Sequence, residues 1–571
     1  MKEKSVAAFI LEGLKKEGID TLFLVPGGML DPFMSAFGEA RIQAITAAHE
    51  GGAAFMADGY ARARGDFGVC MGIGGPGITN MVTAIASAYT DQSPVLVIGG
   101  TIPREWEGLG AVQDSSISGM NDLEFMRPVT AFAAQLPVAP AVPRFLKMSI
   151  RAMFGFERRP TFLSIPLFMQ EETITADYEP RTSAACPRIL DRSVMGKVID
   201  RLKNAVNIVI FVGNGALRSN ACAQIQEFME HYRIPAVTTL HAKGTISEDH
   251  PLSFGVFGIG GSLQANDVIM GNRQDPAKTV PPPDVILALG VSLNEQNAVA
   301  MGDLNKSGEI IHVDINPGNL EDARYHSLAV LGDVREFLAY LESSGEITRA
   351  LEENSQKRKP WLENIRGNPR YDSEADRGTD ILPMHPARVL VELRKIAPRD
   401  TMVVVDSGAH TFFTAHHWTS YGPNQCLVWT NNGPMGYAVA AAIGAKLAHP
   451  ESPCIAIIGD GGMMMHGMEI QTAARYNTPI VVLVLNNGAL GNVYLRARRQ
   501  NKEEAMGLTR CPVHDWVLFG QSLGAKGRKV EQYDQLPDAF REALSSDGPY
   551  IIDARCGRDY NTPNPGESAL L

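Results

Sequence analysis

The sequence has few of the features that would place a protein outside the ordinary globular class. Its seven cysteines, at positions 70, 186, 222, 426, 454, 511 and 556, are odd in number and include no C-x-x-C pair, so neither a disulfide framework nor a zinc site is indicated. No apolar run approaches the roughly 20 residues that a membrane-spanning helix needs. Residues 1–19 are amphipathic, carry acids and lack a small-residue cleavage site, which favours a first helix over a signal peptide. We therefore expect a cytoplasmic protein with reduced thiols and no membrane partner.

Positive charge is also scarce. The 52 Lys and Arg residues against 63 Asp and Glu give a formal charge of -11, and basic clusters such as 357–359 are short, so we expect no nucleic-acid partner. A hydrophobic content of 45% and a charged content of 20% are ordinary for a globular protein. A chain of 571 residues is too long for one hydrophobic core, so we expect about three domains.

Residues 453–487 are the most informative stretch. An apolar run at 455–458 ends in Gly-Asp-Gly-Gly, a helical pattern covers 463–476, and a second apolar run at 480–485 ends in Asn-Asn, which predicts a βαβ unit. Asp460 and Asn487 then lie at the carboxyl ends of two neighbouring parallel strands. Their oxygens suit Mg²⁺ or Ca²⁺, and Mg²⁺ normally completes its shell with phosphates and water. The glycines and the helix start would accommodate such an anion, so the stretch predicts a magnesium–diphosphate site. The alternative is an ordinary βαβ unit in which the Asn-Asn pair occurs by chance.

The first part of the chain alternates predicted strands and helices, which indicates an α/β architecture with a mostly parallel sheet. Three groups of residues each follow an apolar strand: Pro26 with Gly27 and Gly28, Glu50, and residues 74–77. In such sheets the binding and catalytic residues lie in the loops at the carboxyl ends of the strands. Glu50 precedes a run of small and apolar residues, so we expect it in a poorly solvated setting suited to sharing a proton. The alternative is that Glu50 has no role in proton transfer and is simply an acid favoured at a helix start by the helix dipole.

These motifs together resemble a known family. The segments VPGG (25–28), AAHEGGAAFMADGYAR (47–62) and GIGGPGITNMVTAIASAYTDQSPVLVIGG (72–100), with Gln113 and the Gly-Asp-Gly…Asn-Asn pattern, resemble the acetolactate-synthase-like branch of thiamine-diphosphate (ThDP) enzymes. The resemblance implies three doubly wound parallel-sheet domains. They are a ThDP pyrimidine-binding domain (1–180), a central domain (190–345) and a pyrophosphate- and Mg-binding domain (360–571).

The resemblance also implies roles for individual residues. Glu50 would bond to the N1′ atom of the cofactor's aminopyrimidine and activate it, with Gly27, Gly28 and Gln113 nearby in the catalytic centre. Asp460, Asn487 and the carbonyl of Ala489 would bind Mg²⁺. Gly433 would accept the 4′-amino group, and Met435 would separate the two rings, although a methionine there is also typical of plain core. The full set of expected cofactor contacts is Pro26, Glu50, Gly408, His410, Gly433, Met435, Gly459, Asp460, Gly461, Gly462, Asn487, Ala489, Leu490 and Gly491.

The central region has its own α/β pattern, with strands expected at 206–212, 284–290 and 310–315 and a long loop at 258–283. The turn at Gly213, Asn214 and Gly215 is an incomplete dinucleotide fingerprint because its sixth position is Arg218, so a structural strand-to-helix turn is preferred. In the family this domain carries FAD, an ADP-type ligand or nothing. Gly213 to Gly215 and Asp314 would lie near any such ligand.

The implied activity is ThDP- and Mg-dependent cleavage or decarboxylation of a 2-oxo acid, or of a related acyl donor, with ligation of the fragment to an acceptor. Cleavage without ligation, of the benzoylformate or oxalyl-CoA type, is one alternative, and a flavin-dependent oxidoreductase is another. The family's Gln-Trp pair aligns with Leu495 and Arg496, which argues against a standard acetolactate synthase, and Val493 replaces the glutamate of simple pyruvate decarboxylases. Arg496 and Arg498 are candidates for binding an anionic substrate, or are surface residues. Because the family builds its site from two subunits, a homodimer or homotetramer is implied.

Overall fold

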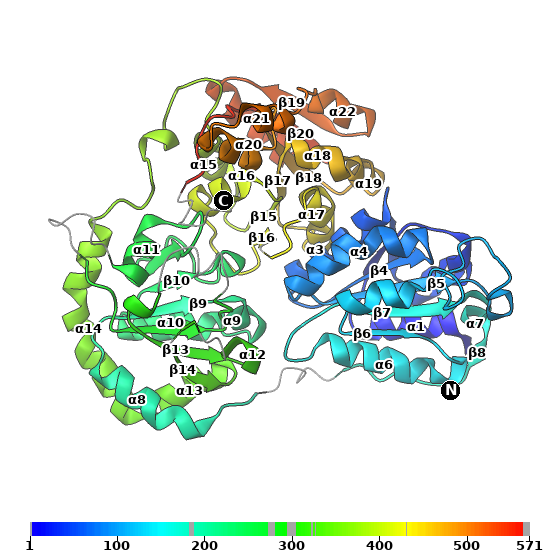
Figure 1. Ribbon diagram of the computed structural model, residues 1–571, viewed down its shortest axis with the longest axis horizontal. Helices are drawn as coiled ribbons and strands as arrows, with labels where there is room; N and C mark the ends of the chain where they lie inside the picture. Colours follow the sequence, from blue (N-terminus) through cyan, green and yellow to red (C-terminus); the bar gives the residue numbers. More distant parts are fainter. Residues whose placement is uncertain are drawn as a thin grey trace.

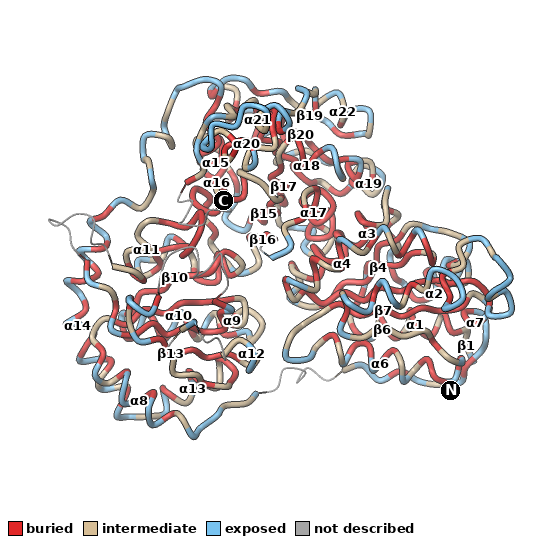
Figure 2. Tube along the Cα trace, in the orientation of Figure 1, coloured by how far each residue is buried: buried red, intermediate tan, exposed pale blue. Residues whose placement is uncertain are grey.

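The computed structural model describes residues 3–181, 188–271, 280–293, 304–320, 324–325, 327–429 and 431–563. Within these ranges each of three domains contains a six-stranded parallel sheet, as predicted from the sequence. In Figure 1 the N-terminal domain is blue to cyan, the central domain green and the C-terminal domain yellow to red. The central strands of each sheet are deeply buried, and the outer helices carry many of the exposed residues (Figure 2).

The N-terminal sheet has the strand order β3-β2-β4-β5-β7-β6. Its strands are β2 (Thr21–Leu24), β3 (Gln43–Thr46), β4 (Gly68–Ile73), β5 (Val95–Thr101), β6 (Phe132–Gln135) and β7 (Thr161–Pro166). The covering helices are α1 (Val6–Lys16), α2 (Asp31–Ala40), α3 (Glu50–Arg64), α4 (Pro76–Thr90), α5 (Asp122–Met126), α6 (Val142–Met153) and α7 (Leu167–Glu171). Two short strands, β1 (Lys4–Ser5) and β8 (Thr173–Ile174), pair at the end of this domain.

The central sheet has the order β11-β10-β9-β12-β13-β14. Its strands are β9 (Ile208–Val212), β10 (Ala236–Thr238), β11 (Ser253–Val256), β12 (Val285–Leu289), β13 (Glu309–Asp314) and β14 (Ser327–Leu331). Its helices are α8 (Met195–Asn204), α9 (Asn214–Arg218), α10 (Cys222–Tyr232), α11 (Leu263–Met270), α12 (Pro317–Leu320), α13 (Val334–Ser343) and α14 (Gly345–Arg366). Buried side chains form a separate core on each face of this sheet.

The C-terminal sheet has the order β16-β15-β17-β18-β20-β19. Its strands are β15 (Met402–Val405), β16 (Cys426–Val428), β17 (Cys454–Gly459), β18 (Ile480–Asn486), β19 (Lys526–Val530) and β20 (Tyr550–Arg555). Its helices are α15 (Pro386–Ile396), α16 (Ala409–His417), α17 (Tyr437–Ala448), α18 (Asp460–His466), α19 (Ile470–Arg475), α20 (Gly491–Arg499), α21 (Glu503–Thr509), α22 (Trp516–Ser522) and α23 (Leu536–Leu544).

Two predicted elements differ from the structure. The single helix expected over 463–476 is two helices, α18 and α19, separated by a short 3-10 turn at Gly467–Glu469. The long loop expected over 258–283 contains α11, because Ser262 caps the helix by accepting the Ala265 N–H at 3.1 Å and an apolar face packs inward. Residues 272–279 of that stretch lie outside the described residues.

Helices α3 and α17 join the N- and C-terminal domains into one body (Figure 1). A Cβ atom at Gly59 would lie 2.1 Å from the carbonyl oxygen of Ala441, and one at Gly444 would lie 1.9 Å from that of Met56. Only glycine permits this approach of the two backbones. A single hydrophobic core therefore runs from the N-terminal sheet through both helices to the C-terminal sheet. No helix in the described ranges is both long and apolar enough to cross a bilayer.

Candidate active site

The carboxyl ends of β15, β17 and β18 surround a cavity of about 300 Å³. Its wall contains all the predicted site residues of the C-terminal domain, which come from four separate stretches of sequence: Gly408, His410, Gly433, Met435, Gly459, Asp460, Gly461, Gly462, Asn487, Ala489, Leu490 and Gly491. This is the crevice in which open parallel sheets bind their ligands.

Asp460 is the acid of this cavity. Its side chain is buried at the start of α18, and Oδ1 accepts the Gly461 N–H at 3.0 Å. Oδ2 is also buried, yet no described residue forms a hydrogen bond to it at bonding geometry. Burial raises the pKa of Asp460 to about 6, and nearby backbone amides of Gly488 and Ala489 oppose that rise. A buried carboxylate oxygen without a partner is what a bound cation would satisfy.

The loop after β18 supplies the other oxygen donors. Asn487 Oδ1 accepts the Ala489 N–H at 3.1 Å, and Gly488 between them has φ 63°, a conformation that favours glycine. The preceding Asn486 faces the other way, since its Nδ2 donates to Asp553 Oδ1 at 2.9 Å. One carboxylate, one amide and one carbonyl oxygen form a hard donor set that fits Mg²⁺ completed by phosphate and water.

The turn between β17 and α18 is shaped by its neighbours across the cavity. A Cβ atom at Gly461 would lie 2.5 Å from Leu490 Cδ2 and 3.1 Å from Met435 Cε. Met435 therefore lies directly against the glycine turn, with its side chain on the cavity wall. His410 is buried beside Gly459, and burial lowers its pKa to about 4, so the imidazole is neutral at pH 7.

Asp406, which the sequence did not single out, holds the Met435 segment in place. It is fully buried at the end of β15, and its carboxylate accepts the N–H groups of Ser407, Gly436 and Ala438 at 2.8 to 2.9 Å. Burial raises the pKa of Asp406 to about 7 against these bonds. Its only sequence signal was an acid directly after a buried strand.

The N-terminal site residues form a second group at the carboxyl edge of their own sheet. Pro26, Gly27 and Gly28 follow β2, and Glu50 begins α3 after β3. Glu50 is half-buried and accepts the Asn80 Nδ2 at 2.9 Å in an exposed bond, so the poorly solvated setting that we expected for it is absent within the single chain. Gln113 has φ 60° and lies beside Gly75.

The two groups do not meet within one chain. Among the described residues that line the C-terminal cavity, none belongs to the N-terminal domain. The residues just before α3 instead dock on the 3-10 turn after α18, where the Glu469 carboxylate accepts the N–H groups of Ala48 and His49 at 3.0 and 3.1 Å. Glu50 and Asp460 therefore lie in two separate groups of predicted site residues, which we call the N-terminal and C-terminal half-sites.

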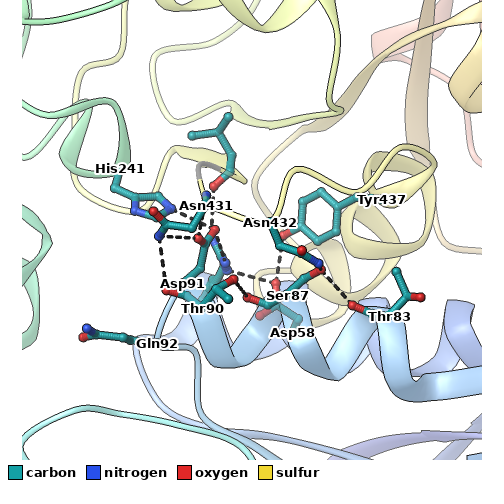
Figure 3. Close-up of polar contacts among 12 residues, drawn as sticks. Asp58, Thr83, Ser87, Thr90, Asp91, Gln92, His241, Asn431, Asn432 and Tyr437 are labelled. Atoms are coloured by element: carbon teal, nitrogen blue, oxygen red, sulfur yellow. Dashed lines mark hydrogen bonds and ion pairs between the residues drawn. The ribbon is translucent and has the colours of Figure 1, made fainter. Parts of the chain in front are cut away.

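A buried carboxylate, Asp91 at the end of α4, connects all three domains (Figure 3). Its Oδ2 lies 3.0 Å from His241 Nε2 of the central domain and 3.1 Å from Arg62 Nη2. Its Oδ1 accepts the backbone and side-chain N–H groups of Asn431 at 3.0 and 2.8 Å. Burial alone would raise the pKa of Asp91, but His241 and Arg62 hold it well below its usual range. Asn431 and the next residue, Asn432, which donates to Ser87 Oγ at 2.7 Å, fix the chain just before Gly433 and Met435.

The central domain has a cavity of about 230 Å³ at the point where the strand order reverses between β9 and β12. Gly213, Asn214, Gly215 and Asp314, the residues predicted to lie near any ligand of this domain, line this cavity. Asp314 accepts the Asn316 N–H at 2.8 Å, and burial raises its pKa. The turn at 213–215 leads directly into α9, as preferred from the sequence.

Three protein-family models match the chain, one for each domain. They are described as thiamine pyrophosphate enzyme, N-terminal TPP binding domain (residues 4–120), central domain (195–341) and C-terminal TPP binding domain (406–554).

Similar known proteins match the chain over nearly its whole length. The "Probable acetolactate synthase large subunit" of Methanococcus aeolicus is 30% identical over 567 residues, covering 96% of this chain and 91% of the relative. The "Acetolactate synthase" of Arthrospira platensis is 29% identical, over 98% of this chain and 95% of the relative. The "Acetolactate synthase isozyme 2 large subunit" of Escherichia coli (strain K12) is 26% identical, over 96% and 94%.

Proposed function

This chain belongs to the thiamine pyrophosphate enzyme family, and from that premise we propose that it cleaves a 2-oxo acid with ThDP and Mg²⁺ and ligates the resulting acyl fragment to a second carbonyl compound. The protein is a ThDP-dependent enzyme of the acetolactate-synthase-like kind. One observation carries the finer proposal: Asp460, Asn487 and Ala489 face one cavity, and the buried Asp460 Oδ2 has no partner among the described residues.

The chain's own residues bind and orient the cofactor. The oxygens of Asp460, Asn487 and Ala489 would hold Mg²⁺ and, through it, the diphosphate, while Gly461 keeps the wall free of side chains. When bound, ThDP would supply a carbon nucleophile for the substrate carbonyl and a thiazolium ring able to take up the electron pair released as CO₂ leaves. Met435 and the Gly433 carbonyl would fix the pose of the rings, and Glu50 would hold a proton at the ring end.

We propose a homodimer as the smallest active form, with Glu50 of one subunit completing the cavity of the other. Support comes from exposed apolar side chains at both half-sites. Met464, Met465 and Met468 lie exposed on the C-terminal half, and Leu109 and Val112 lie exposed near Gln113 at the N-terminal half, with Val112 83% exposed. Such surfaces are typical of a subunit interface. A cytoplasmic location is also proposed, on the basis of the acidic, globular composition.

The acceptor side favours a second candidate. Val493 and Leu495 line the cavity, so the position at which the sequence departs from the family's Gln-Trp pair is near the cofactor contacts. This departure makes cleavage without ligation the alternative to a standard ligation. Arg496 and Arg498, the predicted anion-binding candidates, are not among the residues lining the cavity.

The test is turnover of a 2-oxo acid panel (pyruvate, glyoxylate, benzoylformate and oxalyl-CoA), with ThDP and Mg²⁺ added or withheld and products identified by mass. We expect cofactor-dependent loss of CO₂ and a ligated product. Free aldehyde or formyl product alone would favour the second candidate. A flavin-bearing preparation that turns over without ThDP would favour an oxidoreductase with FAD in the central cavity, and an ADP-type ligand there would appear in the mass spectrum of the denatured protein.

A further inference from the structure

The segment after β20 forms one wall of the active-site cavity. Cys556, Gly557, Arg558 and Tyr560 all line it. The segment is fixed on both sides of Arg558: the Cys556 N–H donates to the Asn486 carbonyl at 2.9 Å, and the Gly557 N–H donates to the Met384 carbonyl at 3.0 Å. Beyond it, the Tyr560 hydroxyl donates to the Pro383 carbonyl at 2.7 Å. The backbone that carries Arg558 is therefore held against the cavity.

The neighbouring Asp559 is held by α20. It accepts the Tyr494 hydroxyl at 3.1 Å, and its Oδ1 lies 3.1 Å from Arg498 Nη1. Arg498, which the sequence suggested as an anion-binding residue, thus has its charge matched by an acid on the outside of the cavity.

Arg558 differs from Arg498 in having no such acid. Its Nη2 lies 3.4 Å from the position of a Cβ atom on Gly488, in the loop that carries Asn487 and Ala489. Among the described residues, Arg558 has neither a hydrogen-bond acceptor nor an ion-pair partner. It is also the one Arg or Lys in the described cavity wall, which otherwise contains the single acid Asp460. The cavity thus presents beside the predicted cofactor site a guanidinium that has no partner among the described residues and is carried on a held backbone.

We propose that Arg558 binds the carboxylate of the 2-oxo acid substrate. This rests on the proposed function, which supplies the substrate class. A guanidinium matches a carboxylate with two parallel N–H···O bonds, and the partly enclosed cavity strengthens such a pair. The same chemistry would also fit the diphosphate of the cofactor. We favour the carboxylate because Asp460, Asn487 and Ala489, through Mg²⁺, already provide for the diphosphate.

The test compares Arg558→Gln with Arg558→Lys, Arg498→Gln and the matched control Arg528→Gln. Arg528 is a half-buried arginine on β19 that pairs with Glu542 of α23. Protein loaded with ThDP and Mg²⁺ is used for kinetics and oxamate binding, and cofactor-free protein in Mg²⁺ buffer is used for ThDP binding. The readouts are the KM and kcat for pyruvate, the affinity for oxamate, an unreactive pyruvate isostere, and the affinity for ThDP itself, the last two by calorimetry.

We expect Arg558→Gln to raise the pyruvate KM and weaken oxamate binding roughly ten- to hundredfold, with ThDP affinity unchanged and partial rescue by Lys. Loss of ThDP affinity with intact oxamate binding would overturn the carboxylate in favour of the diphosphate. Unchanged binding of both, or loss of oxamate binding in Arg498→Gln instead, would overturn the role of Arg558. If the parent turns over no 2-oxo acid, the proposed function fails, whereas oxamate binding by parent and variant still decides whether Arg558 binds a carboxylate.

Discussion

The two half-sites, at the carboxyl edges of the C-terminal and N-terminal sheets, differ in how much of a binding site each completes. The C-terminal edge encloses a cavity with buried donors, an unpartnered carboxylate oxygen and a neutral imidazole. The N-terminal edge presents its residues at the surface, with Glu50 bonded to Asn80 and exposed apolar side chains nearby. The C-terminal edge resembles a site that can bind a ligand by itself. The N-terminal edge resembles a surface that becomes part of a site only when it contacts another subunit. The comparison predicts that cofactor binding and cofactor activation can be separated by mutation.

Asp460→Ala should have the largest effect on cofactor binding and turnover. It removes the only carboxylate among the described residues of the cavity wall, so Mg²⁺-dependent ThDP binding should weaken by more than about 100-fold and turnover should disappear. Calorimetric titration of ThDP with and without Mg²⁺ measures this. The exposed Asp534→Ala is the matched control, and parental affinity in Asp460→Ala would contradict the assignment.

Glu50→Gln should separate activation from binding. Glutamine keeps the shape and the bond to Asn80 but cannot exchange the proton, so kcat should fall by roughly 100- to 10,000-fold while ThDP affinity stays near the parental value. Steady-state kinetics and the same titration measure the two quantities. Glu39→Gln on α2 is the control, and equal loss of binding and turnover would argue that Glu50 is structural.

Mixing the two inactive variants tests whether the half-sites are completed between subunits. In a mixed dimer of Glu50→Gln and Asp460→Ala, one site would carry both changes and the other would carry neither. Random reassembly should therefore recover about a quarter of parental activity, because half of the dimers are mixed and each has one intact site. No recovery after verified subunit exchange would indicate that each site is built within one chain.

His466, at the end of α18, should give the smallest effect. Its ring packs on His49 at 5.4 Å between the two half-sites, and burial, aided by His49, lowers its pKa to about 4. The folded-state pKa of His466 lies below its unfolded value of about 6.5, so folding favours the neutral ring. The contribution of His466 to the free energy of unfolding is therefore present above pH 6.5 and is lost as the pH falls towards 4. Between pH 7 and 5 the free energy of unfolding of the parent should fall by about 2 kcal/mol more than that of His466→Gln, measured by urea unfolding. If the free energies of unfolding of the parent and His466→Gln change with pH in parallel, this prediction is contradicted.

Much of the fold could be predicted from the chain itself. Apolar strands that end in glycine and polar turns predicted parallel sheets, and the structure confirms them. The family predicted from motifs such as Gly459–Gly462 is also confirmed. The roles of Glu50 and Asp460 stay predictions, although the residues expected around the metal do share one cavity.

The residues that sequence reasoning missed share a physical reason. Asp406, Asp91 and Arg558 have contacts with neighbours that are distant in the chain, and the only local signal noted among them is the buried strand that precedes Asp406. Asp91, for example, meets His241 about 150 positions later and Asn431 about 340 positions later. The periodicity of apolar residues indicates which face of a single helix or strand is buried, whereas these contacts depend on how separate domains pack.

The glycine-to-backbone contact between α3 and α17 has a consequence for heating. The N- and C-terminal domains share one core, whereas the central domain has two cores of its own. The central domain meets the others through the His241–Asp91 pair and through Leu240 and Val256, which pack into the C-terminal core. Regions that share a core lose their structure cooperatively. Calorimetry should therefore resolve two transitions, with the first and last thirds of the chain melting together although the middle third separates them in sequence.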